Sequence, residues 1–202
     1  MVMRNQLIIL AAFIFLMACK KDVIIQHEGF VPISEESVYH SLQVQGNYEY
    51  YEIRNNYCFD STRYDVIYSE GIKPYTDSIF SAANEGVFYS SGDLCMYNNI
   101  LLYDGNEYRF LNTYADIIDF LGPVDCTGDA LFVAHLNGYY FKYDDTEFGI
   151  KEVTGGFLID AFKLISACTP LQTDKFLIKI DRNGEISIQD QAVWFKDDNA
   201  CI

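Results

Sequence analysis

The chain has 202 residues, of which 50% are apolar, 21% charged and 16% aromatic. This composition is sufficient for one substantial hydrophobic core, and it excludes a predominantly disordered chain. Lys and Arg number 14 against 29 Asp and Glu, which gives a formal net charge of -15 at pH 7. Because a strongly acidic protein repels phosphate backbones, we expect no nucleic-acid partner.

The first residues have the pattern of an export signal. One positive charge, Arg4, precedes an unbroken apolar run from Leu7 to Ala18. This run of about 12 residues is too short to span a membrane as a helix, which takes roughly 20 residues. We therefore interpret it as a signal for export and not as a permanent membrane span.

The four residues that end the apolar run, Leu-Met-Ala-Cys, resemble the lipobox of bacterial lipoproteins, with Cys19 in the position that is modified. The resemblance implies that residues 1–18 are a lipoprotein signal peptide and that Cys19 carries a diacylglycerol. Two or three acyl chains would hold the protein to a membrane stably. A first helix of the mature fold, or a simple secretory peptide cut near Ala18, are the alternatives.

Cys19 is followed by Lys20, Lys21 and Asp22, and such a start resembles many lipoproteins from Bacteroidota. The resemblance implies an outer-membrane protein whose membrane partner is reached through the lipid anchor. It leaves open whether the protein faces the periplasm or the cell surface.

Five of the six cysteines remain after Cys19 is set aside: Cys58, Cys95, Cys126, Cys168 and Cys201. An odd number leaves one thiol unpaired, and disulfides persist outside the inner membrane. Cys168 and Cys201 follow the first and the third of three successive antiparallel strands predicted between residues 156 and 195. Because these two strand ends lie at the same edge of a sheet, we predict a Cys168–Cys201 disulfide.

A second disulfide, Cys58 with Cys95, is a weaker prediction that leaves Cys126 free. The alternative is that all five thiols are reduced and buried.

The first half of the mature chain is predicted to contain a short tether followed mainly by strands. The elements in order are a tether and packed segment over 20–45, strands over 48–54 and 63–69, a short helix over 76–84, a strand from Val87, and a hairpin of 100–103 with 107–110. The hairpin prediction rests on Asp104-Gly105, because this pair accepts the positive φ of a type I′ turn.

Two helices are predicted next. The first covers 113–121, with Thr113 and Asp116 as a capping box and Gly122-Pro123 as its end. The second covers about 127–137, with Asp125 or Thr127 as its cap.

The rest of the chain is predicted to be a five-strand meander over 139–143, 150–154, 157–165, 175–181 and 185–194. Asn183-Gly184 is its second strong turn signal, and it places Ile178 and Ile180 opposite Ile186 and Ile188. We interpret strand 157–165 as central because it is apolar on both sides. Residues 19–202 are thus expected to form a single α+β domain, mainly antiparallel sheet with two or three short helices covering one face.

Residues 113–202 resemble a group of small uncharacterised lipoproteins of Bacteroidota. The residues that carry the resemblance are Gly122-Pro123-Val124-Asp125, Leu136-Asn137-Gly138-Tyr139, Cys168 and the terminal Ala200-Cys201-Ile202. This resemblance implies no activity.

Residues with catalytic potential are few and scattered. The chain contains no phosphate-binding loop, no dinucleotide fingerprint and no Gly-x-Ser-x-Gly nucleophile turn. His27, His40 and His135 are too far apart for a close metal pair, and a Cys126 nucleophile activated by His135 is disfavoured because the two are more than a helical turn apart. We therefore assign no catalytic residue, no cofactor and no metal.

Two further clusters have ordinary interpretations that we favour. Carboxylates that could bind Ca²⁺ lack the spacing of an EF-hand loop, so we interpret them as turn and cap residues: Asp125, Asp129, Asp144, Asp145, Glu147 and Glu152. The tyrosine-rich stretches 48–51 and 139–143 are interpreted as sheet packing, with an exposed platform for sugars or proteins as the alternative.

These features favour a lipid-anchored envelope protein that acts as a noncatalytic binding or interaction module, with a protein or a glycan as its partner. The alternative is an envelope glycan hydrolase, which needs only two carboxylates distant in sequence and would leave no local motif.

Overall fold

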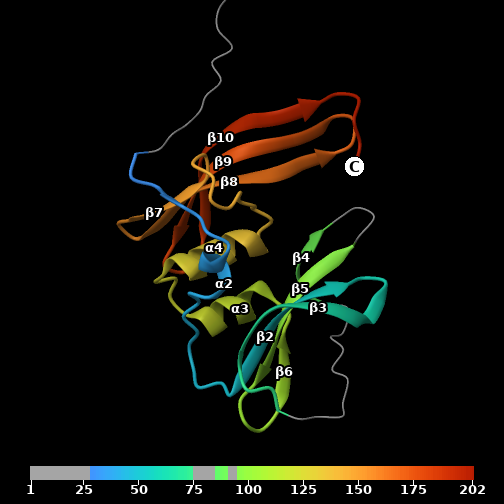
Figure 1. Ribbon diagram of the computed structural model, residues 1–202, viewed down its shortest axis with the longest axis vertical. Helices are drawn as coiled ribbons and strands as arrows, with labels where there is room; N and C mark the ends of the chain where they lie inside the picture. Colours follow the sequence, from blue (N-terminus) through green and yellow to red (C-terminus); the bar gives the residue numbers. More distant parts are fainter. Residues whose placement is uncertain (1–27, 75–84, 91–94) are drawn as a thin grey trace, which may run out of the picture.

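The computed structural model describes residues 28–74, 85–90 and 95–202. The predicted signal peptide, the lipidation site Cys19, His27 and the helix expected over 76–84 lie outside these residues. The described chain forms two five-stranded antiparallel sheets with three short helices between them (Figure 1). It is therefore mainly antiparallel sheet with few helices, as the sequence predicted, but the strands form two sheets where one was expected.

The elements follow one another in this order: β1 (Val31–Pro32), α2 (Glu36–Tyr39), β2 (Tyr50–Tyr57), β3 (Asp60–Gly71), β4 (Val87–Ser90), β5 (Met96–Tyr103), β6 (Tyr108–Leu111), α3 (Tyr114–Leu121), α4 (Thr127–Leu136), β7 (Gly149–Val153), β8 (Gly156–Ala167), β9 (Leu171–Asp181) and β10 (Ile186–Asp197).

Sheet A contains the four C-terminal strands and β1 from the N-terminal segment, in the order β1-β7-β8-β9-β10. Its last hairpin has the predicted register, with Ile186 opposite Ile180 and Ile188 opposite Ile178. Gly184 adopts a φ of 80° in the turn between them, a conformation that costs glycine little.

The strand predicted over 139–143 is wrong. Only Tyr140 forms a bridge there, to Phe162 of β8, and the fifth strand of sheet A is the two-residue β1 from the N-terminal segment. β1 pairs with β7 through Val31–Ile150 and Pro32–Gly149. Partners 117 and 119 positions apart in sequence leave no local signal, so strand periodicity could not identify this pairing.

Sheet B contains the N-terminal strands in the order β3-β2-β5-β4, with β6 also paired to β5. The predicted hairpin forms as β5 and β6, and Gly105 in its turn has a φ of 95°. Strands β2 and β3 are longer than expected and pair over almost their whole length.

The helices begin and end largely as predicted. Thr113 and Asp116 form the capping box of α3, and Gly122 follows its last residue with a positive φ of 73°. The cap of α4 is neither Asp125 nor Thr127 but Cys126, whose Sγ accepts the Asp129 N–H at 3.5 Å. The short α2 was not predicted, because four residues give too little periodicity.

The helices were expected to cover one face of one sheet, and they instead pack against both sheets (Figure 1). Buried side chains from sheet B, the helices and sheet A belong to one continuous cluster, which includes Ile100, Ile117, Leu131, Ile159 and Ile178. None of the helices in the described part of the chain is long and apolar enough to cross a membrane.

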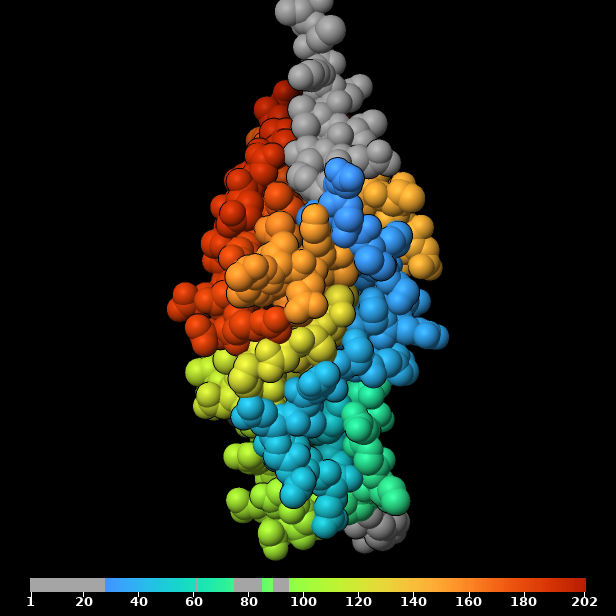
Figure 2. Space-filling view, turned by 90° about the vertical axis from the view of Figure 1, so that its left-hand side faces the viewer, coloured from blue at the N-terminus to red at the C-terminus, as the bar shows by residue number. Residues whose placement is uncertain are grey.

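The segment after residue 28 packs against the body of the protein, as the sequence predicted for much of 20–45. Figure 2 shows it running along one side of the molecule from sheet A past the helices towards sheet B. Ile33 and Val38 are buried, and the Gln45 N–H donates to the Phe120 carbonyl oxygen at 2.7 Å.

Both predicted disulfides are present. Cys168–Cys201 joins the end of β8 to the chain after β10, and Cys58–Cys95 joins the β2–β3 turn to the start of β5 in sheet B. Among the cysteines that the structure describes, Cys126 is the free one, as the predicted pairing of Cys58 with Cys95 requires. The alternative of five reduced thiols is therefore wrong.

Candidate functional site

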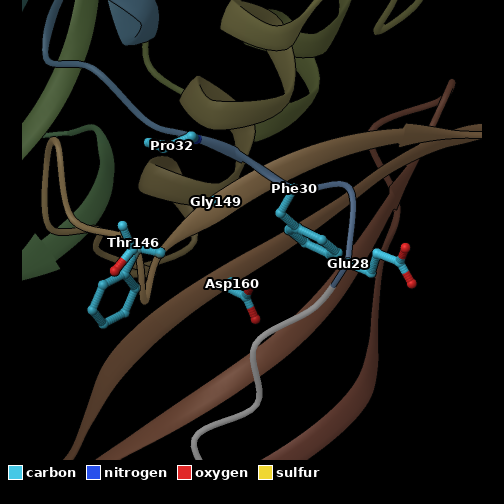
Figure 3. A pocket seen from close by; sticks show the side chains of 7 residues that line it. Glu28, Phe30, Pro32, Thr146, Gly149 and Asp160 are labelled. Atoms are coloured by element: carbon cyan, nitrogen blue, oxygen red, sulfur yellow. The ribbon is translucent and has the colours of Figure 1, made fainter.

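The chain segment that contains β1 forms one wall of a pocket on sheet A. The pocket has a volume of about 400 Å³ and is lined by residues of this segment, of the turn before β7, and of β8 (Figure 3): Glu28, Phe30, Pro32, Thr146, Phe148, Gly149 and Asp160. The pairing of Pro32 with Gly149 joins two of these walls. The pocket therefore depends on contacts between residues more than a hundred positions apart.

Asp160 is the buried charged group of this pocket. Its neighbours on β8, Ile159 and Ala161, are buried in the main core, so the alternation of the strand places Asp160 on the opposite face of the sheet. Only 3% of Asp160 is exposed. Burial raises the pKa of its carboxyl to about 7, although the charge of Lys175 opposes the rise.

Aromatic side chains form the remainder of the pocket and continue beyond it. Phe148 is buried, and its ring centroid lies 5.6 Å from that of Phe162 and 5.5 Å from that of Trp194. In Figure 3, Asp160 lies between the side chain of Phe30 and the turn that carries Thr146. Trp194 is the only tryptophan of the chain, so its fluorescence reports on the Phe148 wall.

Two lysines hold the turn against the aromatic rings. The Lys175 Nζ donates to the Glu147 carbonyl oxygen at 2.7 Å and lies 4.9 Å from the centroid of Phe148. The Lys142 Nζ lies 4.6 Å from the centroid of Trp194. These cation–π contacts and the backbone hydrogen bond fix the position of one pocket wall.

A second pocket, of about 530 Å³, lies along the same N-terminal segment, between Val31 and the start of α4 at Thr127. Its floor includes the buried side chains of Ile150 and Phe157. The residues that line it include Glu152 and Lys151, but the buried carboxyl of the first pocket has no counterpart among the described lining residues. We therefore regard the Asp160 pocket as the better candidate.

The structure separates Cys126 from His135, which lie towards opposite ends of α4. The Cys126 thiol donates to the Ser41 carbonyl oxygen at 2.9 Å, and burial raises its pKa. His135 packs against the rings of Phe88 and Tyr140, with centroids 6.0 and 5.6 Å away, and burial lowers its pKa. Cys126 therefore caps the helix, and His135 packs among aromatic rings.

The acidic residues singled out in the sequence are dispersed. Asp125 and Glu152 pair with Arg182 at 3.0 and 2.9 Å, and Asp145 accepts the Glu147 N–H of its own turn at 2.8 Å. Among the residues that the structure describes, no three acidic, histidine or cysteine side chains converge as metal ligands would.

The tyrosine stretches pack mostly inside the protein. Tyr50, Tyr51 and Tyr139 are buried, whereas 42% of Tyr143 is exposed. The aromatic cluster beside the pocket is built instead from Phe148, Phe162 and Trp194, none of which belongs to those stretches. One signal was present: Asp160 is one of two charged residues, with Lys163, in the mostly apolar stretch 157–165, and a charge inside a central strand needs a special environment.

Comparison of the chain with protein-family models, with curated proteins and with solved structures found no match. The chemistry of the pocket is therefore the basis on which a function can be assigned.

Proposed function

We propose that the protein is a lipid-anchored protein of the bacterial outer membrane that binds a ligand in the Asp160 pocket without transforming it. The observation that carries this proposal is the pocket itself, which is lined by Asp160, a residue that is 3% exposed, together with Phe30 and Phe148. Apolar and aromatic walls with a few placed polar groups are typical of ligand sites.

The position of the pocket in the chain supports the anchored role. Glu28 at its rim follows the predicted lipid-bearing Cys19 by nine residues. A chain of that length spans at most about 32 Å when it is fully extended. The lipid anchor would therefore keep the pocket close to the membrane surface.

A glycan hydrolase is the second candidate, because the pocket also contains a second carboxyl, Glu28, and because an acid with a raised pKa suits a general acid. Glycosidases need two carboxyl groups about 5 to 9 Å apart and facing the same bond. In Figure 3, however, the Glu28 carboxylate points away from Asp160. The binding function is therefore favoured.

The anchor is tested by mass spectrometry of the protein extracted from the membranes of a bacterial host. We expect loss of residues 1–18 and a lipid on Cys19, and we expect C19S to leave the membrane fraction. An unmodified thiol at Cys19 would contradict the anchored role.

The binding function is tested by titrating the full-length protein with peptidoglycan fragments, neutral oligosaccharides and small amines, with Trp194 fluorescence as the readout. We expect at least one class to bind and to be recovered unchanged by chromatography. Cleaved products that disappear with D160N would instead support the hydrolase, and no response to any class would contradict a ligand site here.

A further inference from the structure

We propose that the face of sheet A opposite the helices lies on the phospholipid bilayer, with Trp194 and Phe195 inserted into its interfacial layer. This contact is a second attachment to the membrane beside the lipid on Cys19. The inference rests on the anchored role proposed above, because the tether must bring this face to the membrane.

The two faces of sheet A are buried to different degrees. Phe176 and Ile178 of β9 face the helices and are buried in the core. Lys175 and Leu177, which alternate with them, point to the other side and are only half-buried. Most residues of the neighbouring edge strand β10 are exposed. The described elements therefore leave the outer face of sheet A, the face opposite the helices, partly open at β9 and β10.

A β-bulge in β10 turns two successive aromatic side chains to this outer face. Phe195 is opposite Thr173, which lies on the same face of β9 as Lys175. Trp194 is the extra residue of the bulge, and its ring centroid lies 5.2 Å from that of Phe162, the residue opposite Lys175 on β8. In a regular strand, neighbouring side chains point to opposite faces. The bulge therefore makes an aromatic pair that regular alternation would separate.

Both aromatic side chains are exposed enough to contact another surface. Trp194 is 38% exposed and Phe195 is 49% exposed, and Ile165 at the bulge of β8 is exposed as well. The Nζ of Lys142 lies 4.6 Å from the ring centroid of Trp194. Aromatic rings beside a lysine are typical of membrane interfaces, where the rings enter the headgroup layer and the ammonium group stays in water.

The described chain begins on the same outer face. Glu28, its first residue, lines a pocket with Asp160, which also lies on this face of β8. At most about 32 Å of extended chain separates Glu28 from Cys19. In Figure 1, sheet B lies at the opposite end of the molecule. The tether therefore holds sheet A, and not sheet B, beside the membrane, where even a weak contact is effective because it is intramolecular.

The bilayer fits this surface better than a second copy of the chain. A second copy would pair with the edge of β10, but two bulges interrupt that strand, and Lys196 and Asp197 place charges along it. Both features are typical of edges that are protected from pairing. The formal charge of -15 also opposes attachment to an anionic membrane by charge alone. The apolar side chains must therefore supply the attraction.

The experiment uses Trp194 as the reporter, because it is the only tryptophan of the chain. The lipidated protein, purified from bacterial membranes, is reconstituted into vesicles of phosphatidylcholine and phosphatidylethanolamine. Phosphatidylcholine brominated near the top of its acyl chains quenches a tryptophan in the interfacial layer, whereas acrylamide quenches a tryptophan in water. We expect quenching of Trp194 by the brominated lipid and protection from acrylamide.

The variant F195D replaces a ring in the bilayer by a charge. We expect it to shift the equilibrium between the docked and the undocked protein towards the undocked form by about tenfold or more, which lowers quenching by the brominated lipid. F195S removes the ring without adding a charge, and it provides a second test if F195D does not fold. The matched control is F59D, because Phe59 is also exposed but lies in the β2–β3 turn of sheet B. It should leave the quenching unchanged.

Quenching of Trp194 by acrylamide but not by the brominated lipid would overturn the inference, as would equal quenching in the natural chain and in both Phe195 variants. Either result leaves the anchored role in place if Cys19 carries a lipid. Protection of Trp194 that disappears when the protein is diluted with lipid would show that a second copy covers this face, and it would also overturn the inference. If Cys19 carries no lipid, the anchored role fails. Quenching of the unlipidated chain by brominated vesicles would then still support this face as a membrane contact, and its absence would overturn both proposals.

Discussion

The two sheets of this protein bury different kinds of side chain. The face of sheet A towards the helices is apolar, with Ile159 and Ile178 fully buried on neighbouring strands. Sheet B contributes Ile53 and Ile100 to the same core. In addition it buries charged and amide side chains along β2 and β5: Glu52, Arg54, Asn56, Asn98 and Asn99.

In sheet B the buried charges satisfy one another. Arg54 Nε donates to Glu52 Oε1 at 2.6 Å, Lys73 Nζ lies 2.9 Å from Glu52 Oε2, and Tyr50 also donates to this carboxylate. Burial by itself would raise the pKa of Glu52, but the hydrogen bonds from Tyr50 and Lys73 and the charge of Arg54 outweigh it and lower the pKa. In sheet A, the pKa of Asp160 rises because one lysine does not offset its burial.

This contrast teaches that a buried carboxyl can have opposite roles in one molecule. Where hydrogen bonds and cations surround it, as at Glu52, it belongs to the structure. Where burial outweighs a neighbouring charge and the carboxyl borders a pocket, as at Asp160, it is a candidate for binding.

The largest effect is expected from E52Q, which removes the counter-ion of Arg54 in the interior of sheet B. Because Arg54 is buried and would lose the charge of the carboxylate that its guanidinium contacts, we expect a loss of about 3–5 kcal/mol in the free energy of unfolding. Chemical denaturation measures this loss. The control is E152Q in sheet A, which breaks an exposed pair with Arg182 and should cost less than about 1 kcal/mol. If both variants lost the same free energy of unfolding, the buried charges of sheet B would be no more important for stability than the exposed ion pair of sheet A.

The disulfides offer one site of comparison in each sheet. Cys58–Cys95 links residues 37 positions apart and Cys168–Cys201 links residues 33 positions apart. Chain entropy therefore predicts that replacing either pair by serines lowers the unfolding free energy by about 3–4 kcal/mol. Denaturation of the two double variants measures this, and losses that differ by more than about 2 kcal/mol would show that local packing outweighs chain entropy.

The Asp160 carboxyl is expected to make stability depend on pH. Because its pKa is raised in the folded state, its contribution is complete below the ordinary value of 3.8 and is lost as the pH rises through about 7. D160N removes this loss, so we expect it to be more stable than the natural chain at pH 8 by on the order of 2 kcal/mol. The difference should shrink towards acidic pH. The free energy of unfolding of both chains, measured at several pH values, checks this prediction. If D160N were less stable than the natural chain at pH 8, the Asp160 carboxylate would not be poorly solvated.

The smallest effect is expected at the start of α4, between the sheets. C126A removes the side chain that accepts the Asp129 N–H, so we expect a loss of about 1 kcal/mol. C126S keeps an acceptor in the same position and should retain most of the stability. Thermal unfolding of the two variants gives the comparison, and a serine variant no more stable than the alanine variant would show that the cap contributes little.

In sheet A the sequence predicted the last hairpin together with its register, although the strand that it predicted over 139–143 was wrong. Ile178 and Ile180 opposite Ile186 and Ile188 follow from simple alternation around an Asn-Gly turn, and the structure confirms them. In β2, Glu52, Arg54 and Asn56 lie on a buried face, which reverses the usual meaning of polar residues in a strand. The sequence predicted this strand but not that its polar face is covered.

The candidate site was less predictable than the fold. Asp160 was visible as a charge in an apolar strand, but its position beside Phe30 depends on β1 adding to the edge of sheet A. A two-residue strand carries no periodic signal. The cap formed by Cys126 was missed for a similar reason, because cysteine is not among the usual capping residues.

Local rules within the amino-acid sequence determined the turns at Gly105 and Gly184, the capping box of α3 and the antiparallel C-terminal strands, because each depends on residues that are close together in the chain. Tertiary structure alone decided that the strands divide into two sheets around the helices. It also decided that the N-terminal segment closes a pocket over Asp160. Those outcomes depend on which apolar and charged surfaces meet across long loops, and neighbouring residues do not encode that choice.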